Sequence, residues 1–330
     1  MRIDSSAPTR IDLAGGTYDI WPLYLFHDRA QTINAALSLR ARCSLTPCDD
    51  GRVVLVSDDT GECVEAAGPG DLDVERLPLV ARLVRHFGAR GLEVRTKSDS
   101  PVGAGIAGSS AMNVALAAAL ARWTGRRLSD DELLTIAMNI EAQVIRVPTG
   151  VQDYRPALYG GVSAVELDVT GVRRTALSVP VRDLEQRLVL AYTGASRNSG
   201  INNWDVMARR IGNDPIVVAA FDGIRDAAIG LREALEAGDW PGVAKHLSCE
   251  WEHRKRLGPT VTTDRIDDLF ARAREAGALS GKVCGAGGGG CLFCLVSPDD
   301  RSKVSTALAS AGATLLPFSI ESDGLRVVES

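Results

Sequence analysis

Hydrophobic and polar positions along the chain follow two periods, and these divide it into a strand-rich first half and a helix-rich second half. Alternation of apolar and polar residues, often β-branched, is the two-residue period of a half-buried strand. This pattern predicts strands at the following segments: 30–48, 52–57, 92–97, 161–168, 188–193, 291–296 and near 315–320.

Helices are predicted where apolar residues recur at helical spacing or where Ala and Leu dominate: 78–88, 111–123, 129–147, several segments between about 204 and 276, and 300–311. Ser129 is followed three residues later by Glu132, the spacing of a capping box, so one helix begins there; it ends before Pro148. Strands and helices mix without regular βαβ alternation, which favours an α+β fold over a doubly wound sheet. We expect two domains, 1–175 and 176–330.

Composition and charge restrict the class of protein. The chain has 330 residues, of which 45% are hydrophobic and 24% charged, as in a soluble globular protein of about two domains. The net charge of −5 argues against a nucleic-acid-binding protein, which usually has a basic face. It leaves nucleotide binding open, because a few local donors can hold a triphosphate. The first residues lack the apolar core of a signal peptide, and no stretch approaches roughly 18 apolar residues, so we expect a cytoplasmic protein that does not bind membranes.

The seven cysteines have irregular spacing, unlike a disulfide framework. Cys291 and Cys294 form a single C-x-x-C within a segment that is predicted to be a buried strand. No second pair and no nearby histidine accompany them in the sequence. We therefore predict buried structural thiols rather than a redox or zinc site.

Candidate chemistry first appears in a glycine-rich segment, PVGAGIAGSSA at 101–111, between a predicted strand and an Ala-rich helix. Glycines allow backbone N–H groups to approach a ligand closely, and the N-terminus of the following helix adds positive potential. The segment can therefore hold phosphates, and the hydroxyl of Ser109 or Ser110 could reach a Mg²⁺ ion. It matches neither a P-loop nor the G-x-G-x-x-G of a dinucleotide-binding fold. Taken alone, it could also be an ordinary glycine-rich turn.

Two further segments are rich in glycine. The segment KVCGAGGGGC at 282–291 has five glycines in six positions. Because each glycine weakens a strand or helix by roughly 0.5–1 kcal/mol, a ligand or another backbone is expected to come close there. The segment PTRIDLAGGTYD at 8–19 contains a tight glycine turn, with Arg10 before it and Asp19 after it.

In this order and at these distances, the three segments resemble the three signature motifs of the GHMP kinases (galactokinase, homoserine kinase, mevalonate kinase and phosphomevalonate kinase). The closest likeness is to the bacterial D-glycero-D-manno-heptose 7-phosphate kinase branch, indicated by LAGG at 13–16, YTGASRNS at 192–199 and GALSGKVCGAGGGG at 277–290. The resemblance implies an N-terminal mixed α/β domain with the ATP-binding loop and a C-terminal ferredoxin-like α+β domain. It also implies transfer of the γ-phosphoryl group of ATP to a hydroxyl of a sugar or sugar phosphate, such as the anomeric hydroxyl of a heptose 7-phosphate.

The resemblance assigns roles to individual residues. Glu141, with Ser109 or Ser110, would hold Mg²⁺, while Asp153 would take the proton of the acceptor hydroxyl and Arg10 would neutralise charge on the moving phosphoryl group. The residues expected to bind ATP are Gly103, Gly105, Ala107, Gly108, Ser109 and Ser110. The residues expected to bind the acceptor are Gly16, Thr17, Asp19, Arg197, Gly287 and Gly288.

Several departures from the family pattern leave alternatives open. The phosphate loop is one residue longer than usual, so either serine could meet the metal. Tyr154 follows the presumed base where sugar kinases usually have Gln, and with Trp21 and Tyr24 it is expected either to line an altered acceptor pocket or to belong to the core. The acceptor could also be a hydroxy acid or an isoprenoid precursor, and a catalytically silent sugar- or nucleotide-binding relative is a further alternative. The presence of Glu141 and Asp153 favours an enzyme. A homodimer is left open.

Overall fold

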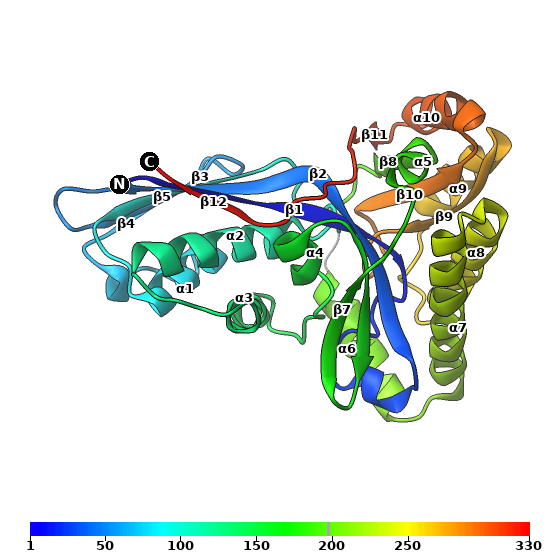
Figure 1. Cartoon of the computed structure of the whole chain (residues 1–330), viewed down its shortest axis with the longest axis horizontal. Helices are drawn as coiled ribbons and strands as arrows, with labels where there is room; N and C mark the ends of the chain where they lie inside the picture. The colour runs from blue at the N-terminus through cyan, green and yellow to red at the C-terminus, as the bar shows by residue number, and fades with distance from the viewer. Residues whose placement is uncertain (197–198) are drawn as a thin grey trace.

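The computed structural model describes residues 1–196 and 199–330, with the side chains of 199–202 left out of the description. Two sheets form its framework (Figure 1). The larger sheet has the order β12-β1-β2-β5-β3-β4, with β6 paired to β2 and β7 paired to β6. Its strands are β1 (Ile3–Ala14), β2 (Ala30–Pro47), β3 (Val53–Ser57), β4 (Cys63–Ala66), β5 (Leu92–Ser98), β6 (Val162–Asp168), β7 (Gly171–Ala176) and β12 (Arg326–Glu329).

Strand β2 joins the two arms of the molecule that are visible in Figure 1. Its first residues pair with β6 and its last residues pair with β5, while β1 pairs along most of its length. The first eight residues of β2 are buried on both faces, which explains why this part of the strand is so rich in apolar and small residues. The strand predicted at 30–48 is thus one long bent element.

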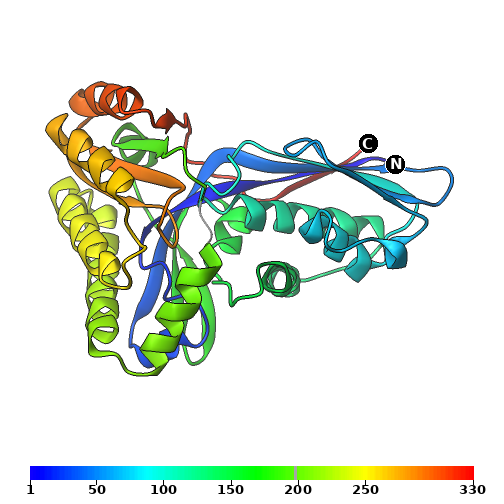
Figure 2. The same cartoon turned by 180° about the vertical axis from the view of Figure 1, so that it is seen from behind.

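Helices α1 (Pro78–Phe87), α2 (Gly108–Trp123) and α3 (Asp130–Ile145) cover one face of the larger sheet, as Figures 1 and 2 both show. The many alanines of α2 are buried against β1 and β2, because small side chains allow a helix to lie close to a sheet. The capping box of Ser129 and Glu132 that begins α3 is confirmed. Helix α2 begins three residues earlier than predicted, directly after Ala107, which has a left-handed φ of 61°.

The second sheet is antiparallel, with the order β11-β8-β10-β9. Its strands are β8 (Leu188–Tyr192), β9 (Ala278–Val283), β10 (Cys291–Val296) and β11 (Thr314–Leu315). The helices of the second half of the chain are α5 (Val181–Gln186), α6 (Ser199–Ile211), α7 (Pro215–Ala237), α8 (Trp240–Lys255), α9 (Asp264–Glu275) and α10 (Arg301–Ser310). Every residue of β10 is buried, so Cys291 and Cys294 lie in the core as predicted. The α+β class is confirmed.

The sequence pattern missed some elements at the ends of the chain. Strand β1 was not predicted, and the strand predicted near 315–320 consists of the two residues of β11 and one bridge between Leu37 and Ile320. Strand β12 returns to the larger sheet and pairs with β1, so the two termini lie side by side (Figure 2). The division into domains at 175 and 176 stays a prediction. Within the described part of the chain, no helix has the length and apolar character needed to span a bilayer.

Candidate active site

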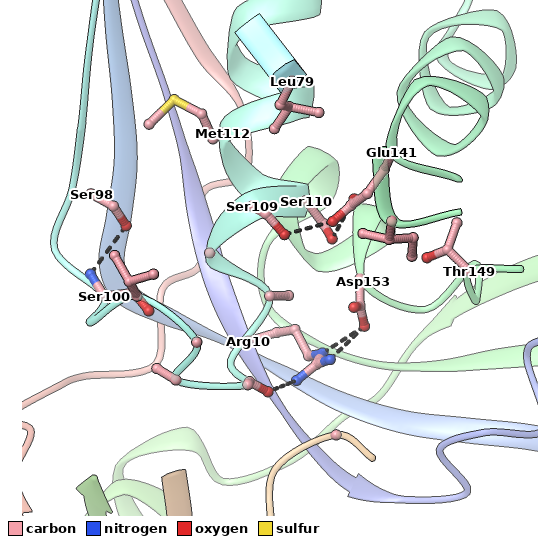
Figure 3. Close-up of a pocket in the computed structure, with 18 of the residues that line it drawn as sticks. Arg10, Leu79, Ser98, Ser100, Ser109, Ser110, Met112, Glu141, Thr149 and Asp153 are labelled. Atoms are coloured by element: carbon pink, nitrogen blue, oxygen red, sulfur yellow. Dashed lines mark hydrogen bonds and ion pairs between the residues drawn. The ribbon is translucent and has the colours of Figure 1, made fainter. Parts of the chain in front are cut away.

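A cavity of about 490 Å³ lies where the three glycine-rich segments meet (Figure 3). Each segment contributes to its wall, and Gly285 and Ala286 come from the third. The predicted site residues that line it are Arg10, Thr17, Asp19, Gly103, Gly105, Ala107, Gly108, Ser109, Ser110, Glu141 and Asp153. The fold therefore brings together residues from distant parts of the chain, since Arg10 and Ala286 are 276 positions apart.

The N-terminus of α2 faces this cavity. Gly103 and Gly105 have left-handed φ angles of 70° and 75°, and Ala107 follows at 61°. The N–H of Ala111 donates to the carbonyl of Ala107, at 2.9 Å, so the amides of 108–110 precede the hydrogen-bonded ladder of the helix. Such amides and the dipole of the helix favour an anion, so this end of the cavity can hold phosphate groups.

The third glycine-rich segment packs directly on the phosphate loop. The N–H of Cys291 donates to the carbonyl of Ala104 at 2.6 Å, and a Cβ at position 290 would lie 2.6 Å from the same oxygen. A larger residue than Gly290 could not fit without moving the loop. Gly287 has a comparable reason to be glycine, because a Cβ there would lie 2.3 Å from the carbonyl oxygen of Val261. Neighbouring backbone thus explains these two glycines.

Glu141 lies on α3 with its carboxylate among three hydroxyl groups, although it is buried. Ser109 donates to one carboxylate oxygen at 2.5 Å, and Ser110 and Tyr154 donate to the other at 2.8 and 2.7 Å. Burial raises the pKa of Glu141, and the three hydroxyl donors oppose that shift because they favour the charged form. Ser109 is exposed to the cavity whereas Ser110 is buried.

Oxygen donors of this kind suit Mg²⁺, which prefers hard ligands and usually keeps water and nucleotide phosphates among them. Within residues 1–196 and 199–330, no group of three or more His, Cys, Asp and Glu side chains is placed to hold a metal ion. A metal bound by Glu141 and Ser109 would therefore complete its shell with phosphate and water oxygens. The exposure of Ser109 makes it the better placed of the two serines for such a role.

Arg10 and Asp153 form an ion pair at the centre of the cavity (Figure 3). Nε and Nη2 of Arg10 both donate to Oδ1 of Asp153, at 2.9 and 2.5 Å, and Nη1 donates to the carbonyl of Gly105 at 3.0 Å. Burial acts to lower the pKa of Arg10, but Asp153 and Asp12 more than offset it, so the pKa is raised and the guanidinium stays charged. Both bonds end on Oδ1, which leaves Oδ2 of Asp153 without an Arg10 contact.

Asp19 lies close to this pair. Its carboxylate is 1% exposed and accepts a hydrogen bond of 2.9 Å from the N–H of Gln152. Gly150 lets the chain pass, since a Cβ there would lie 1.8 Å from Oδ2 of Asp19. Burial and the neighbouring carboxylate of Asp153 raise the pKa of Asp19 to about 6. The side chain can therefore accept sugar hydroxyls, but it loses its charge as the pH falls below that value.

The ionisation of Asp19 is expected to lower the free energy of unfolding as the pH rises from about 4 to 6. Its pKa in the folded protein, about 6, exceeds that of an unfolded chain, so in this window the folded state keeps a proton that the unfolded state has released. The stabilisation that this retained proton gives the folded state is about 3 kcal/mol. It is complete below the pKa of Asp19 in the unfolded chain and is lost as the pH rises through its pKa in the folded protein. Thermal unfolding of the wild type and Asp19→Asn between pH 4 and 7 measures this. A difference between the two that does not change with pH would contradict it.

Some predicted positions lie elsewhere. Gly16, Gly287 and Gly288 do not line the cavity, and Arg197 lies outside the described residues. Tyr154 is buried and turned toward Glu141, so of its two expected places it takes the core. The acceptor roles of these glycines and of Arg197 stay predictions.

Sequence reasoning missed a set of buried charges behind the cavity, Asp12, Glu250, Arg254 and Lys282. The available signal was a single charge among apolar and small residues, Asp12 in IDLAGG and Lys282 in LSGKVCG, because such a charge is buried only when it has partners.

Comparisons with known proteins identify related sequences and structures. Residues 75–161 match the family model described as GHMP kinases N terminal domain, and residues 231–314 match the one described as GHMP kinases C terminal. The chain is 30% identical to D-glycero-alpha-D-manno-heptose 7-phosphate kinase of Campylobacter jejuni over 98% of both chains. It is also 30% identical to the mevalonate kinase of Thermococcus gammatolerans, over 73% of this chain and 70% of the relative. A crystal structure described as a D-glycero-D-manno-heptose 1-phosphate kinase from Bacteriodes thetaiotaomicron is 26% identical and covers 99% of both chains, with a TM-score of 0.81.

A helix N-terminus and the paired Arg10 and Asp153 in one cavity suit a kinase that acts on a small molecule. The chain belongs to the GHMP kinase family. The predicted family, fold and enzyme class, an ATP-dependent phosphotransferase, are thereby confirmed.

Proposed function

We propose that this kinase transfers the γ-phosphoryl group of ATP to a hydroxyl of a sugar phosphate, with a heptose 7-phosphate as acceptor. The observation that carries the proposal is the position of Asp153 and Asp19 in one cavity with the N-terminus of α2. One end of that cavity suits phosphates, and the other presents two carboxylates, which accept hydrogen bonds from sugar hydroxyls. The similarity to a heptose 7-phosphate kinase over nearly the whole chain supports the choice of acceptor.

ATP would bind with its phosphates against residues 103–110 and the start of α2, where backbone amides precede the helix ladder. Glu141 and Ser109 would hold Mg²⁺, which supplies positive charge to the phosphate oxygens when it is bound. Ser110 and Tyr154 donate to the second oxygen of Glu141 and so fix the orientation of the carboxylate.

Asp153 would act on the acceptor. Its Oδ2 takes the proton of the acceptor hydroxyl, the hydroxyl oxygen bonds to the γ-phosphorus, and the bond from that phosphorus to the oxygen of the leaving ADP breaks. Arg10 holds Asp153 through Oδ1 and presents a guanidinium, charged at all working pH values, beside the moving phosphoryl group. Asp19 would bind a hydroxyl of the sugar ring.

A non-sugar acceptor is the second candidate, because the chain is also similar to a mevalonate kinase over 73% of its length. Two acceptor-facing carboxylates favour a polyol, since each can accept hydrogen bonds from the hydroxyls of a sugar ring. The possibility of a homodimer stays open, and the cytoplasmic location stays a prediction.

An acceptor screen tests the proposal. Purified protein with ATP and Mg²⁺ is given D-glycero-D-manno-heptose 7-phosphate, the same heptose without phosphate, galactose or mevalonate, and ADP release and the ³¹P spectrum of the product are recorded. We expect the heptose 7-phosphate to give the highest kcat/KM. Preferential turnover of mevalonate would overturn the choice of a sugar, and ADP release at background with every acceptor would favour a silent relative.

A further inference from the structure

A line of buried charges with alternating sign runs from α8 to the cavity. Arg254 bonds Glu250 at 2.5 Å, Glu250 meets Lys282 at 3.1 Å, and Lys282 meets Asp12 at 2.7 Å. Asp12 lies 3.9 Å from Arg10, the partner of Asp153. None of these five side chains is more than 2% exposed. The line connects the second sheet and its helices with the first glycine-rich segment.

Buried charges are costly unless they are paired, and breaking one pair leaves its partner unpaired. The line therefore stays together as a unit. Arg254 stands at the end of this line on α8. Arg254 and Lys282 both contact the same carboxylate oxygen of Glu250. The second oxygen of Glu250 has no hydrogen-bond partner among the described residues. The remaining N–H groups of Arg254 are turned away from the line, toward the turn that ends β1.

At this turn Arg254 makes two further bonds. Nη2 donates to the carbonyl of Gly16 at 2.9 Å, and Nη1 lies 3.2 Å from Oγ1 of Thr17. Because the guanidinium is a rigid planar fork, the contacts to Glu250 and to the turn fix one another.

The turn has a conformation that needs such support. Thr17 has a φ of 76°, a left-handed value that is a rare outlier for a β-branched residue and costs on the order of 1–3 kcal/mol. A strained residue persists only where its surroundings hold it. Two residues later comes Asp19, and both Thr17 and Asp19 line the cavity. The strain is thus located where the acceptor is expected to bind.

We propose that Arg254 is a positioning residue, which clamps residues 15–19 in their strained conformation so that Asp19 is presented to the acceptor. Glu250, Lys282 and Asp12 anchor Arg254, and through Asp12 the same line reaches Arg10. The inference rests on the proposed function in one respect, that the acceptor binds at Asp19. The clamp itself is a property of the free protein.

Arg254→Lys tests the clamp. Lysine keeps the positive charge beside Glu250 but cannot reach Gly16 and Thr17 together, because it lacks the fork. With the heptose 7-phosphate as acceptor, we expect its KM to rise roughly 10- to 100-fold while the KM for ATP stays within about twofold. In the free protein, backbone amides of 15–19 are expected to exchange hydrogen faster than in the wild type, whatever the acceptor is.

Thr17→Gly supplies a rescue. Glycine adopts a positive φ without strain, so a clamp is needed less. Arg254→Lys should therefore speed amide exchange at 15–19 less in a Thr17→Gly background than in the wild type, and this coupling is not expected of a merely structural arginine. If Arg254→Lys does not fold, Thr17→Val tests the same contact from the other side, since it removes the hydroxyl and keeps the shape.

Arg40→Lys is the matched control. Arg40 is also buried and bonds a carboxylate, Glu321, together with the carbonyls of Ser6 and Gly324, but it does not line the cavity. We expect it to lower stability without changing acceptor KM or exchange at 15–19. The proposal is overturned if Arg254→Lys leaves exchange at 15–19 as in the wild type, or if both variants raise acceptor KM equally. If the wild type phosphorylates no sugar while exchange at 15–19 rises in Arg254→Lys alone, the proposed function fails and the clamp stands.

Discussion

Replacing Asp153 by Asn is expected to lower kcat by roughly 10²- to 10⁴-fold, with little change in the KM for ATP. A sugar hydroxyl is a poor nucleophile at neutral pH, and Oδ2 of Asp153 is the carboxylate oxygen that Arg10 leaves uncommitted. Asparagine keeps the shape of the side chain and can still accept from Arg10, but it cannot take a proton. Steady-state kinetics with the heptose 7-phosphate measure the change.

Asp19→Asn provides the comparison for this variant. Asp19 is a carboxylate in the same cavity, and the proposal gives it only a binding role. It should therefore raise the acceptor KM more than it lowers kcat, because a binding group acts on the ground state and the transition state alike. If Asp153→Asn turned over the acceptor at nearly the wild-type rate, Asp153 would not be the base. Transfer would then depend on positioning and on the charge of Arg10.

Local patterns in the sequence predicted the regular elements well where one period dominated. The long strand at 30–48 and the capped helix that begins after Ser129 are examples. Strand β1 was missed because its second half is buried on both faces and leads into a glycine turn, so no alternation is visible. Strand β12 is four exposed residues, and its place in the sheet depends on pairing with β1, more than 300 positions away in the sequence. No local pattern encodes such a pairing.

The candidate site divides in a similar way. Eleven of the residues assigned by family resemblance line one cavity, since motifs carry the residues that meet the ligand. The pairing of Arg10 with a single oxygen of Asp153 joins positions 143 apart and could not be read from spacing. The line from Arg254 to Asp12 lies one layer behind the cavity, and its members become recognisable only when burial shows that each charge needs a partner.

Glu141→Gln is expected to raise the Mg²⁺ concentration needed for half-maximal activity by roughly 10- to 100-fold. The carboxylate of Glu141 accepts from three hydroxyls and remains the only acidic group bonded to Ser109 and Ser110 in the described structure. Glutamine offers one neutral oxygen and an NH₂ group, so it is a weaker ligand for a hard cation and forces at least one hydroxyl to turn. Activity against free Mg²⁺ at fixed ATP measures the shift.

Binding of Mn²⁺ with a non-hydrolysable ATP analogue, followed by electron paramagnetic resonance, separates metal affinity from turnover. We expect weaker binding in Glu141→Gln by a similar factor. Glu166→Gln is the control, because Glu166 also holds two partners, Arg173 and Arg232, but lies outside the cavity. If Mg²⁺ dependence and Mn²⁺ affinity were the same in Glu141→Gln, Glu166→Gln and the wild type, Glu141 would be a structural charge held by its hydroxyl neighbours. The metal would then have to be bound by the nucleotide phosphates and Ser109 without it.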